Sequence, residues 1–334
     1  MRILFWGTPA YAVPSLNALV EAGHQLVGVV TQPDRRRGRG GALVASPVKQ
    51  RALQLEQQLG HAIPLFSPER ISRDLPMQAQ LAQLGADLSV VVAFGQLLPL
   101  AVLQQPPLGC WNGHGSLLPR WRGAAPIQWA LIEGDSHTGV GIMAMEQGLD
   151  TGPVLLQQSL PIGLLQNAAE LASQLSALTA SLFVEALPRI AAAAAGPEPE
   201  RLARLAVQPQ GSEGICMARL LTKQDSCIDW QANALAIHRR VMGLYPGANT
   251  SWQGRRLKLM ATEPLVARLA DQLSPEAAEL SLRHWRQAEP GSLLEAVKGV
   301  GLVFATGGCP LLLREAQLEG KAAARGTALI QQLG

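Results

Sequence analysis

Residues 3–31 read ILFWGTPAYAVPSLNALVEAGHQLVGVVT, two apolar runs separated by a helix-like segment. The runs at 3–6 and 25–31 are apolar enough for buried strands, and residues 12–22 form a plausible helix that ends before Gly23. A strand–helix–strand unit crosses over with right-handed chirality and makes its two strands parallel. We therefore expect an α/β fold, whose first domain is a Rossmann-like, open, mostly parallel sheet with helices on both faces.

The most apolar run of the chain, residues 88–94, is expected to be a central strand of that sheet. Further helices are expected at 48–59, 76–85, 125–133 and 168–190, and further strands at 63–66 and 140–145. In open parallel sheets, ligands bind beyond the carboxyl ends of the strands. The segment that follows residue 109 should therefore lie at the ligand-binding edge.

Asn112 and His114 are two residues apart, so their side chains share one face if the segment is extended. Gly113 leaves the chain nearly bare between them. An amide donor beside an imidazole suits stabilisation of an oxyanion and movement of a proton. Asp150 follows the expected strand at 140–145 and could approach His114. The alternatives are a solvated surface histidine and a turn-forming aspartate before Thr151.

A family resemblance is carried by several motifs in order. Residues 112–127, NGHGSLLPRWRGAAPI, resemble the signature of the folate-dependent formyltransferases, and residues 145–152, MEQGLDTG, resemble the second motif of that family. With Gly7-Thr8-Pro9 and residues 31–35, TQPDR, the chain is most similar to the branch that acts on tRNA. Trp111 and Gly113 depart from the family pattern, because many relatives have aliphatic residues there.

The resemblance implies transfer of a formyl group from 10-formyltetrahydrofolate to the α-amino group of initiator methionyl-tRNA, for translation initiation in the cytoplasm. It implies that Asn112, His114 and Asp150 are catalytic, and it leaves open whether Asp150 orients the imidazole or receives the proton through water. It further implies that four residues line the folate site: Ser116, Leu117, Leu118 and Pro119. No metal and no obligate protein partner are implied.

Four arginines crowd into residues 35–39, namely Arg35, Arg36, Arg37 and Arg39, among glycines. Nothing apolar recurs within residues 32–41, so we expect a loop without regular structure. A like-charge cluster of this kind is often only a solvated loop. Beside the motifs above, contact with tRNA phosphates is the better interpretation.

We expect a catalytic domain at 1–190, a semi-stiff, proline-containing linker at 191–209 and a second domain at 210–334. By the resemblance the second domain is an OB-like β-barrel that binds tRNA. It holds the basic excess, because residues 208–334 contain 14 basic and 11 acidic side chains. We expect a helix at 234–242 with His238 on its surface, and a helical insertion at 265–288.

Three alternatives remain at this stage. A nicotinamide oxidoreductase is weakened because Gly7 stands alone where the dinucleotide fingerprint needs three glycines. A non-catalytic RNA-binding protein would leave Asn112, His114 and Asp150 without a purpose. Another N-formyltransferase, acting on a ribonucleotide or an amino sugar, is disfavoured by the arginine cluster and the basic second domain.

The remaining composition argues for a globular protein in a reducing compartment. The four cysteines show no C-x-x-C pair or zinc spacing, so we expect buried free thiols. The start of the chain lacks the pattern of a signal peptide, and no apolar run reaches the roughly 20 residues of a membrane span. We therefore expect no membrane partner.

Overall fold

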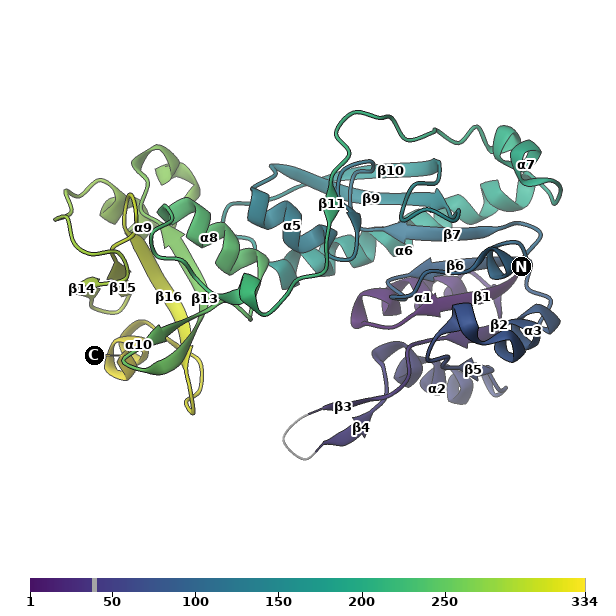
Figure 1. Cartoon of the computed structure of the whole chain (residues 1–334), viewed down its shortest axis with the longest axis horizontal. Coiled ribbons are helices and arrows are strands. Elements are labelled where there is room, and N and C mark those ends of the chain that lie inside the picture. The colour runs from purple at the N-terminus through teal and green to yellow at the C-terminus, as the bar shows by residue number, and fades with distance from the viewer. Residues whose placement is uncertain (38–40, 334) are drawn as a thin grey trace. The chain divides into compact units, whose positions relative to one another are not determined.

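Two compact units make up the chain, of which the computed structural model describes residues 1–37 and 41–333. Figure 1 shows the course of the chain by colour. The units comprise, for the first, residues 1–126, 139–160 and 172–218, and, for the second, residues 127–138, 161–171 and 219–334. Residues 191–209, which we expected to be a linker, belong to the first unit and contain helix α7 (Glu198–Leu205). Pro199 lies in the first turn of α7, where a proline is tolerated, so it helps to start a helix.

A sheet of seven strands within the described residues organises the first unit, in the order β10-β9-β7-β6-β1-β2-β5. Its strands are β1 (Arg2–Gly7), β2 (Gln25–Val30), β5 (Leu65–Phe66), β6 (Leu88–Val92), β7 (Cys110–His114), β9 (His137–Ala144) and β10 (Val154–Pro161). The pairs β5–β2, β2–β1, β1–β6 and β6–β7 are parallel, and β7–β9 is antiparallel. The expected α/β class and the central position of the 88–94 run are confirmed.

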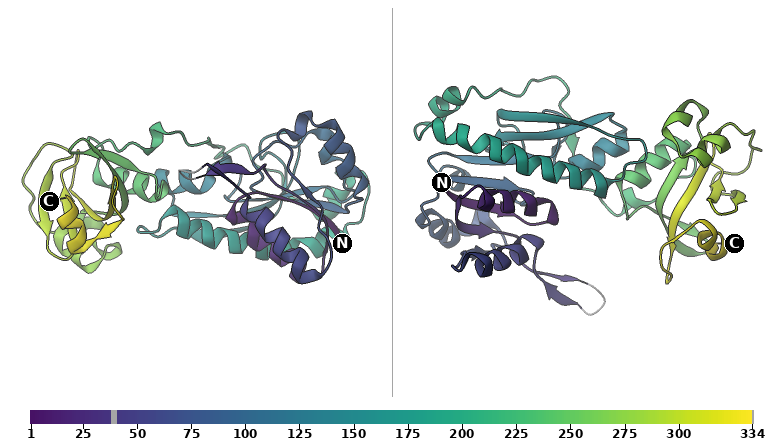
Figure 2. Two further views of the ribbon diagram at one scale, coloured as in Figure 1. Left: turned by 90° about the horizontal axis from the view of Figure 1, so that it is seen from below. Right: turned by 180° about the vertical axis from the view of Figure 1, so that it is seen from behind.

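Helices cover both faces of this sheet. They are α1 (Val13–Glu21), α2 (Pro47–Leu59), α3 (Leu75–Gln83), α4 (Leu100–Leu103) and α6 (Ala168–Ala192), with short 3₁₀ turns at Ala10–Ala12 and Ile71–Arg73. Side chains of α3 and α4 pack on Trp6 and Val91 in one apolar cluster. On the other face, α6 lies across the sheet (Figure 2, right). It approaches β7 so closely that a Cβ at Gly113 would lie 2.8 Å from a ring atom of Phe183. The glycine that departs from the family pattern therefore makes room for α6.

Helix α6 is long and apolar enough to pass a length-and-composition test for a membrane span, contrary to our expectation that no stretch does. Half of the most apolar 18-residue stretch of this helix is buried inside the protein. Leu171, Leu175 and Phe183 on this helix are fully buried. These contacts show how α6 serves as a core helix.

The strands that matter for the site end together. Gly7 at the end of β1 is in register with Val92 at the end of β6, and Val91 is in register with Asn112 on β7. Because these strands are parallel, the loops after them share one edge. At that edge the carbonyl of Phe94 accepts hydrogen bonds from Thr8 Oγ1 at 3.1 Å and Gln32 Nε2 at 3.2 Å.

The second unit contains antiparallel strands and short helices. The strands are β12 (Asn249–Trp252), β13 (Arg255–Pro264), β14 (Leu293–Val297), β15 (Gly301–Phe304), β16 (Leu311–Leu318) and β17 (Ala324–Arg325). The helices are α5 (Pro126–Glu133), α8 (Ala234–Gly243), α9 (Pro275–Ser281) and α10 (Gly326–Leu333), with 3₁₀ turns at Gln224–Ser226 and Ala267–Gln272. The apolar core includes Val241 of α8, Leu257 of β13 and Phe304 of β15. The helical character of residues 265–288 is confirmed by α9 and the turn before it.

His238 on α8 is fully buried, so the expectation that it lies on the surface is wrong. Ala234, Ile237 and Val241 are buried on the same helix, and His238 shares their face because it lies four residues after Ala234. Its Nε2 donates to the carbonyl of Leu164 at 2.8 Å, and its Nδ1 lies 3.1 Å from the Thr262 hydroxyl. Burial lowers the pKa of His238 to about 4, so the ring is neutral at pH 7.

The cysteines are free, as expected, but only one of them is fully buried. Cys110 is buried, Cys216 is partly buried, and Cys227 and Cys309 are exposed. Burial raises the pKa of the Cys110 thiol to about 12. The expectation of uniformly buried thiols is therefore wrong for the two cysteines that follow turns of the second unit.

Candidate active site

His114, the last residue of β7, is buried and held through one ring nitrogen. Its Nε2 lies 2.9 Å from the carbonyl oxygen of Trp121. A carbonyl only accepts hydrogen bonds, so Nε2 carries a hydrogen and donates it. Nδ1 is left facing the carboxylate of Asp150, with 3.6 Å between Nδ1 and Oδ2. The structure thus leaves Nδ1 as the ring atom that can exchange a proton.

Asp150 approaches His114 from the loop after β9, as the sequence predicted. Its Oδ2 accepts the backbone N–H of Gly123 at 2.8 Å, and its side chain is only 12% exposed. Its φ of +53° lies in the left-handed region, which is uncommon for a residue other than glycine. Asp150 therefore both adopts a turn conformation and lies beside His114.

Asn112 lies two residues before His114 on the same strand, and the alternation of β7 puts both side chains on one face. The Asn112 side chain is half-buried and makes no hydrogen bond to any residue that the structure describes. Its amide N–H groups are consequently available to a ligand. Trp111, on the opposite face, is fully buried, and its Nε1 donates to the carbonyl of Leu108 at 2.9 Å.

Residues 116–119, the predicted folate-lining segment, play unequal structural parts. Ser116 is fully buried, and its hydroxyl donates to the carbonyl of Arg120 at 2.6 Å, which closes the turn. Leu118 is 7% exposed, and its carbonyl accepts from Gln157 Nε2 at 3.2 Å. Leu117 and Pro119 are partly exposed. They are the members of the segment that a ligand can reach most readily.

The arginine cluster lies on a ribbon of two antiparallel strands, which we call the arginine arm: β3 (Arg35–Arg37) and β4 (Ala42–Val44). The expectation of a loop without regular structure is therefore wrong for the described residues. The expectation failed because it rested on residues 32–41, whereas the partner strand, in which Leu43 pairs with Arg36, begins at Ala42.

The described part of the arginine arm extends away from the sheet (Figures 1 and 2). Arg35 and Arg36 are exposed, and Leu43 is 67% exposed. Arg39 lies outside the described residues. Cationic and apolar surface is therefore presented together on a projecting element, a combination that suits contact with a nucleic acid.

Sequence reasoning missed a further set of residues around this site, in the segment after α7. Gln210 Nε2 lies 2.8 Å from the carbonyl oxygens of both Asp150 and Gly152. Cys216 accepts the N–H of Trp121 at 3.3 Å through its sulfur. No local pattern marks these residues, because each contact joins positions about 60 or more apart in the sequence.

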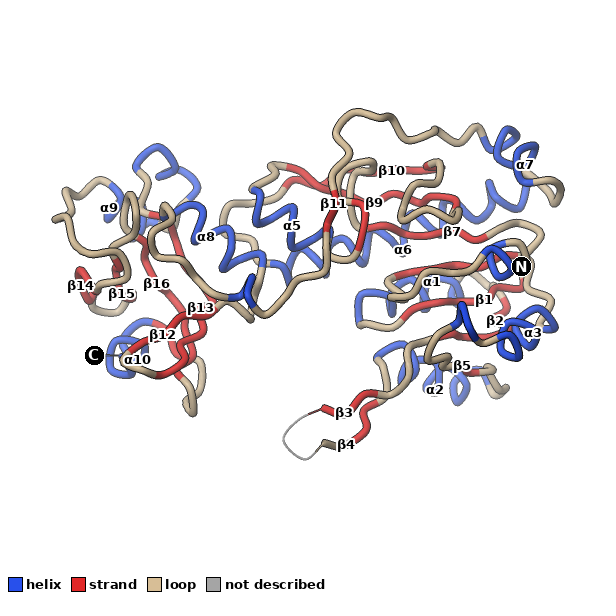
Figure 3. The backbone as a smooth tube through the Cα atoms, in the orientation of Figure 1, coloured by secondary structure: helices blue, strands red, loops and turns tan. Residues whose placement is uncertain are grey.

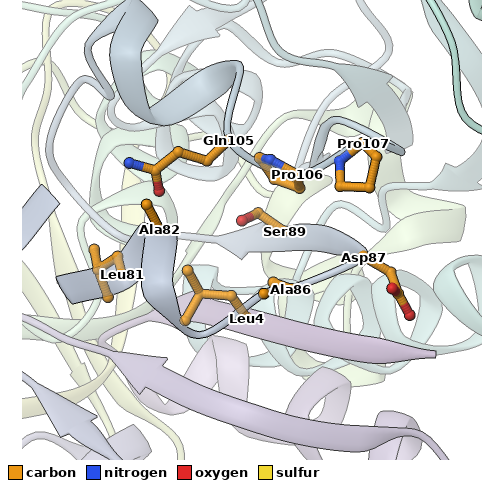
Figure 4. A pocket seen from close by; sticks show the side chains of 10 residues that line it. Leu4, Leu81, Ala82, Ala86, Asp87, Ser89, Gln105, Pro106 and Pro107 are labelled. Atoms are coloured by element: carbon orange, nitrogen blue, oxygen red, sulfur yellow. The ribbon is translucent and has the colours of Figure 1, made fainter. Parts of the chain in front are cut away.

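A cavity of about 190 Å³ lies elsewhere in the first unit (Figure 4). Leu4, Asp87, Ser89 and Gln105 line it, near the amino ends of β1 and β6. It is therefore at the opposite edge of the sheet from Asn112 and His114. Among the residues that the structure describes, no group of three His, Cys, Asp or Glu side chains could hold a metal ion.

Comparisons with known proteins identify the family of the chain. Residues 1–187 match the formyl transferase family, and residues 220–334 match the formyl transferase C-terminal domain. A methionyl-tRNA formyltransferase of Synechococcus sp. (strain RCC307) is 73% identical over 333 residues, covering 100% of both chains. One from Parasynechococcus marenigrum (strain WH8102) is 65% identical, covering 100% of this chain and 97% of the relative.

Solved structures share the fold at low sequence identity. HypX from Aquifex aeolicus, in complex with tetrahydrofolic acid, has a TM-score of 0.60 at 15% identity, covering 100% of this chain and 47% of HypX. An N-formyltransferase from Helicobacter canadensis, in complex with folinic acid and dTDP-3-aminofucose, has a TM-score of 0.61 at 13% identity, covering 94% and 98%. With both of its regions matched and with relatives along its whole length, this chain belongs to the formyl transferase family, in the group of the methionyl-tRNA formyltransferases.

Proposed function

We propose that this protein transfers the formyl group of 10-formyltetrahydrofolate to the α-amino group of initiator methionyl-tRNA. The observation that carries the proposal is the meeting of His114 and Asp150 at the strand ends, with the amide of Asn112 available beside them. The family membership and the names of the relatives support the same reaction. Both substrates enter as reactants, so the protein's own task is to bind, orient and move protons.

Asn112 is assigned to the charge that develops on oxygen. The neutral amine donates its electron pair to the formyl carbon, a new C–N bond forms, and the carbonyl oxygen becomes negative. The amide N–H groups of Asn112 suit that oxygen because no described residue uses them. Collapse breaks the bond to N10 of the folate, which gains one proton, while the amine loses one.

His114 is assigned to that proton movement, through Nδ1. Its Nε2–H is committed to the Trp121 carbonyl, which also fixes the plane of the ring. Asp150 faces Nδ1 at 3.6 Å, where a carboxylate stabilises an imidazolium. Because Asp150 Oδ2 already accepts the Gly123 N–H, we assign it to orienting and stabilising His114 rather than to taking the proton first.

The segment from Ser116 to Pro119 is proposed to form one wall of the folate site. The Ser116 hydroxyl is used inside the turn, so it braces the wall and does not contact the folate. Leu117 and Pro119 supply the partly exposed apolar surface. A pterin or benzoyl ring would pack on such surface through the hydrophobic effect.

The tRNA is proposed to bind the arginine arm and the second domain, residues 210–334. The exposed Arg35 and Arg36 match phosphate geometry, and residues 208–334 carry the basic excess of the chain. We assign Arg37 and Arg39 to the same contact by their place in the cluster. Formylation of charged tRNA belongs to translation, so the proposed place of action is the cytoplasm.

The test is an assay of the purified full-length protein with methionyl-tRNA and 10-formyltetrahydrofolate. N-formylmethionine, measured after deacylation of the tRNA, is the expected product. Parallel reactions offer a dTDP-amino sugar as the formyl acceptor, or a nicotinamide cofactor with small alcohols. Formylation of the sugar without formylation of methionyl-tRNA would overturn the proposal.

A further inference from the structure

The segment after α7 is hydrogen-bonded to both loops that hold the Asn112, His114 and Asp150 site. We call residues 208–218 the strap; Figure 3 shows this stretch as the tube that passes beside β10 and ends in β11 (Met217–Ala218). Gln208 exchanges two backbone hydrogen bonds of 2.8 Å with Val154. At its other end, β11 pairs in parallel with β8 (Arg122–Gly123). The strap therefore connects the loop before β10 with the loop after β7.

Gln210 is the strap residue whose side chain reaches into this arrangement. Its Nε2 donates to the carbonyls of Asp150 and Gly152, each at 2.8 Å, and its Oε1 accepts from Arg122 Nε at 3.0 Å. The reversed amide would turn an oxygen toward two carbonyls, so this orientation is fixed by the partners. One half-buried amide thus satisfies three groups from two loops.

The two loops are those that place the Asp150 carboxylate. Asp150 holds a left-handed φ of +53°, which costs free energy for a residue with a Cβ and needs support from neighbours. Gln210 binds the carbonyl of that same residue. Through Arg122 it also holds the residue before Gly123, whose N–H fixes Asp150 Oδ2 at 2.8 Å.

We infer that Gln210 is a positioning residue for formyl transfer, which holds the Asp150 carboxylate at its distance from His114 Nδ1. This inference rests on the proposed function. Gln210 does not contact the reacting atoms; it acts through the backbone of Asp150 and through Arg122. The strap ends at Ala218, the last residue of the first unit, so Gln210 and the site that it supports belong to the same unit.

Three variants separate positioning from simple chain packing. Gln210→Leu removes all three hydrogen bonds, and Gln210→Glu keeps the acceptor for Arg122 but loses the two donors. Gln208→Leu is the matched control, because the Gln208 side chain is exposed and, among the described residues, bonds only to the nearby carbonyl of Ala206. Gln208→Leu should unfold at the wild-type temperature, whereas the two Gln210 variants should unfold a few degrees lower, because hydrogen bonds are lost from an otherwise intact unit.

The kinetic expectation is a loss of kcat without a loss of binding. Both Gln210 variants should lower kcat by about 10- to 100-fold, with KM for folate and for tRNA within about twofold of wild type, as misplacement of a catalytic group predicts. Gln208→Leu should match the wild type. A rise in KM at unchanged kcat would show that Gln210 serves substrate binding, and would overturn the inference.

A double-mutant cycle tests the route through Asp150. Once Asp150→Asn has removed the carboxylate charge, adding Gln210→Leu should lower kcat by less than about threefold, because residues that act as a unit are not additive. Loss of the full single-variant factor in that background would mean that Gln210 does not act through Asp150.

Amide hydrogen exchange reads the same geometry without any substrate. In Gln210→Leu, the Gly123 N–H should exchange about tenfold faster than in the wild type, because its acceptor carboxylate is released. Gln208→Leu should leave it unchanged. An unchanged exchange rate in Gln210→Leu would overturn the inference, even if the wild type formylates tRNA. If the wild type does not formylate tRNA but the Gly123 N–H still exchanges faster in Gln210→Leu, then only the proposed function has failed.

Discussion

The catalytic edge and the arginine arm place functional side chains in opposite ways. At the edge, His114 and Asp150 are nearly buried, and each has a backbone partner within 3 Å. On the arm, Arg35 and Arg36 project into solvent from a two-stranded ribbon. A reaction that moves one proton needs atoms fixed to tenths of an ångström, whereas attraction of a polyanion needs charge that can adapt. We therefore expect changes at the edge to affect kcat and changes on the arm to affect the affinity for tRNA.

Asp150→Asn should have the largest effect. The variant keeps the shape and the acceptor for Gly123 but removes the charge beside His114, so kcat should fall by about two to four orders of magnitude. Steady-state kinetics at several tRNA concentrations measure it, and KM for tRNA should hardly change. Asp271→Asn, at an exposed aspartate, is the control. Near-normal turnover of Asp150→Asn would show that the Asp150 carboxylate takes no part in the mechanism.

Asn112→Ala should follow, with kcat lower by about 100- to 1000-fold, as for the loss of one oxyanion donor. Its side chain makes no hydrogen bond to the described residues, so the free energy of unfolding should stay near that of the wild type. Urea unfolding and kcat, measured on one preparation, separate the two effects. A large fall in the free energy of unfolding, together with the fall in kcat, would point to a packing role for Asn112 instead.

The double variant Arg35→Gln and Arg36→Gln should raise KM for tRNA by about tenfold and flatten the salt dependence of binding by about 0.7–0.9 log unit per lost phosphate contact. Folate affinity should stay constant. The charge-matched control is Arg70→Gln with Arg73→Gln, at exposed positions of the same unit. An unchanged KM and salt slope in the arm variant would leave the arm as a solvated ribbon.

His238 adds a buried histidine that the proposed chemistry does not use, and its effect should appear in stability alone. Burial lowers its pKa from 6.5 to about 4, so below pH 6.5 the unfolded state binds more protons than the folded state, and stability falls as the pH falls. Between pH 7 and pH 5 the wild type should lose about 2 kcal/mol more than His238→Gln. Urea unfolding at both pH values measures this difference; equal losses would contradict it.

The parallel sheet and the face shared by Asn112 and His114 followed from the sequence, because both depend on local periodicity. The alternation of side chains along a strand depends only on the residues of that strand. The match of β1, β2 and β6 to apolar runs is likewise a property of each strand alone. The approach of Asp150 to His114 was expected because Asp150 lies in the loop after an apolar strand.

Features that depend on distant partners could not be read in this way. The strap contacts of Gln210 join positions 58 to 88 residues apart, and β10 is an edge strand whose side chains alternate only weakly between exposed and buried. His238 was misjudged because two arginines follow it, although its spacing from Ala234 puts it on the buried face. For α7, proline and alanine composition suggested a linker, while the buried Arg201 anchors the helix by donating to the carbonyl of Leu108.

The most direct test of the division between edge and arm is a single-turnover measurement of formyl transfer at saturating methionyl-tRNA and saturating folate. Under these conditions the Arg35→Gln and Arg36→Gln variant should recover to within about threefold of the wild-type rate, because saturation offsets a loss that lies only in binding. Asp150→Asn should remain slower by at least about 100-fold, because saturation cannot restore the carboxylate. Recovery of Asp150→Asn, or a persistent defect of the arm variant, would contradict the account.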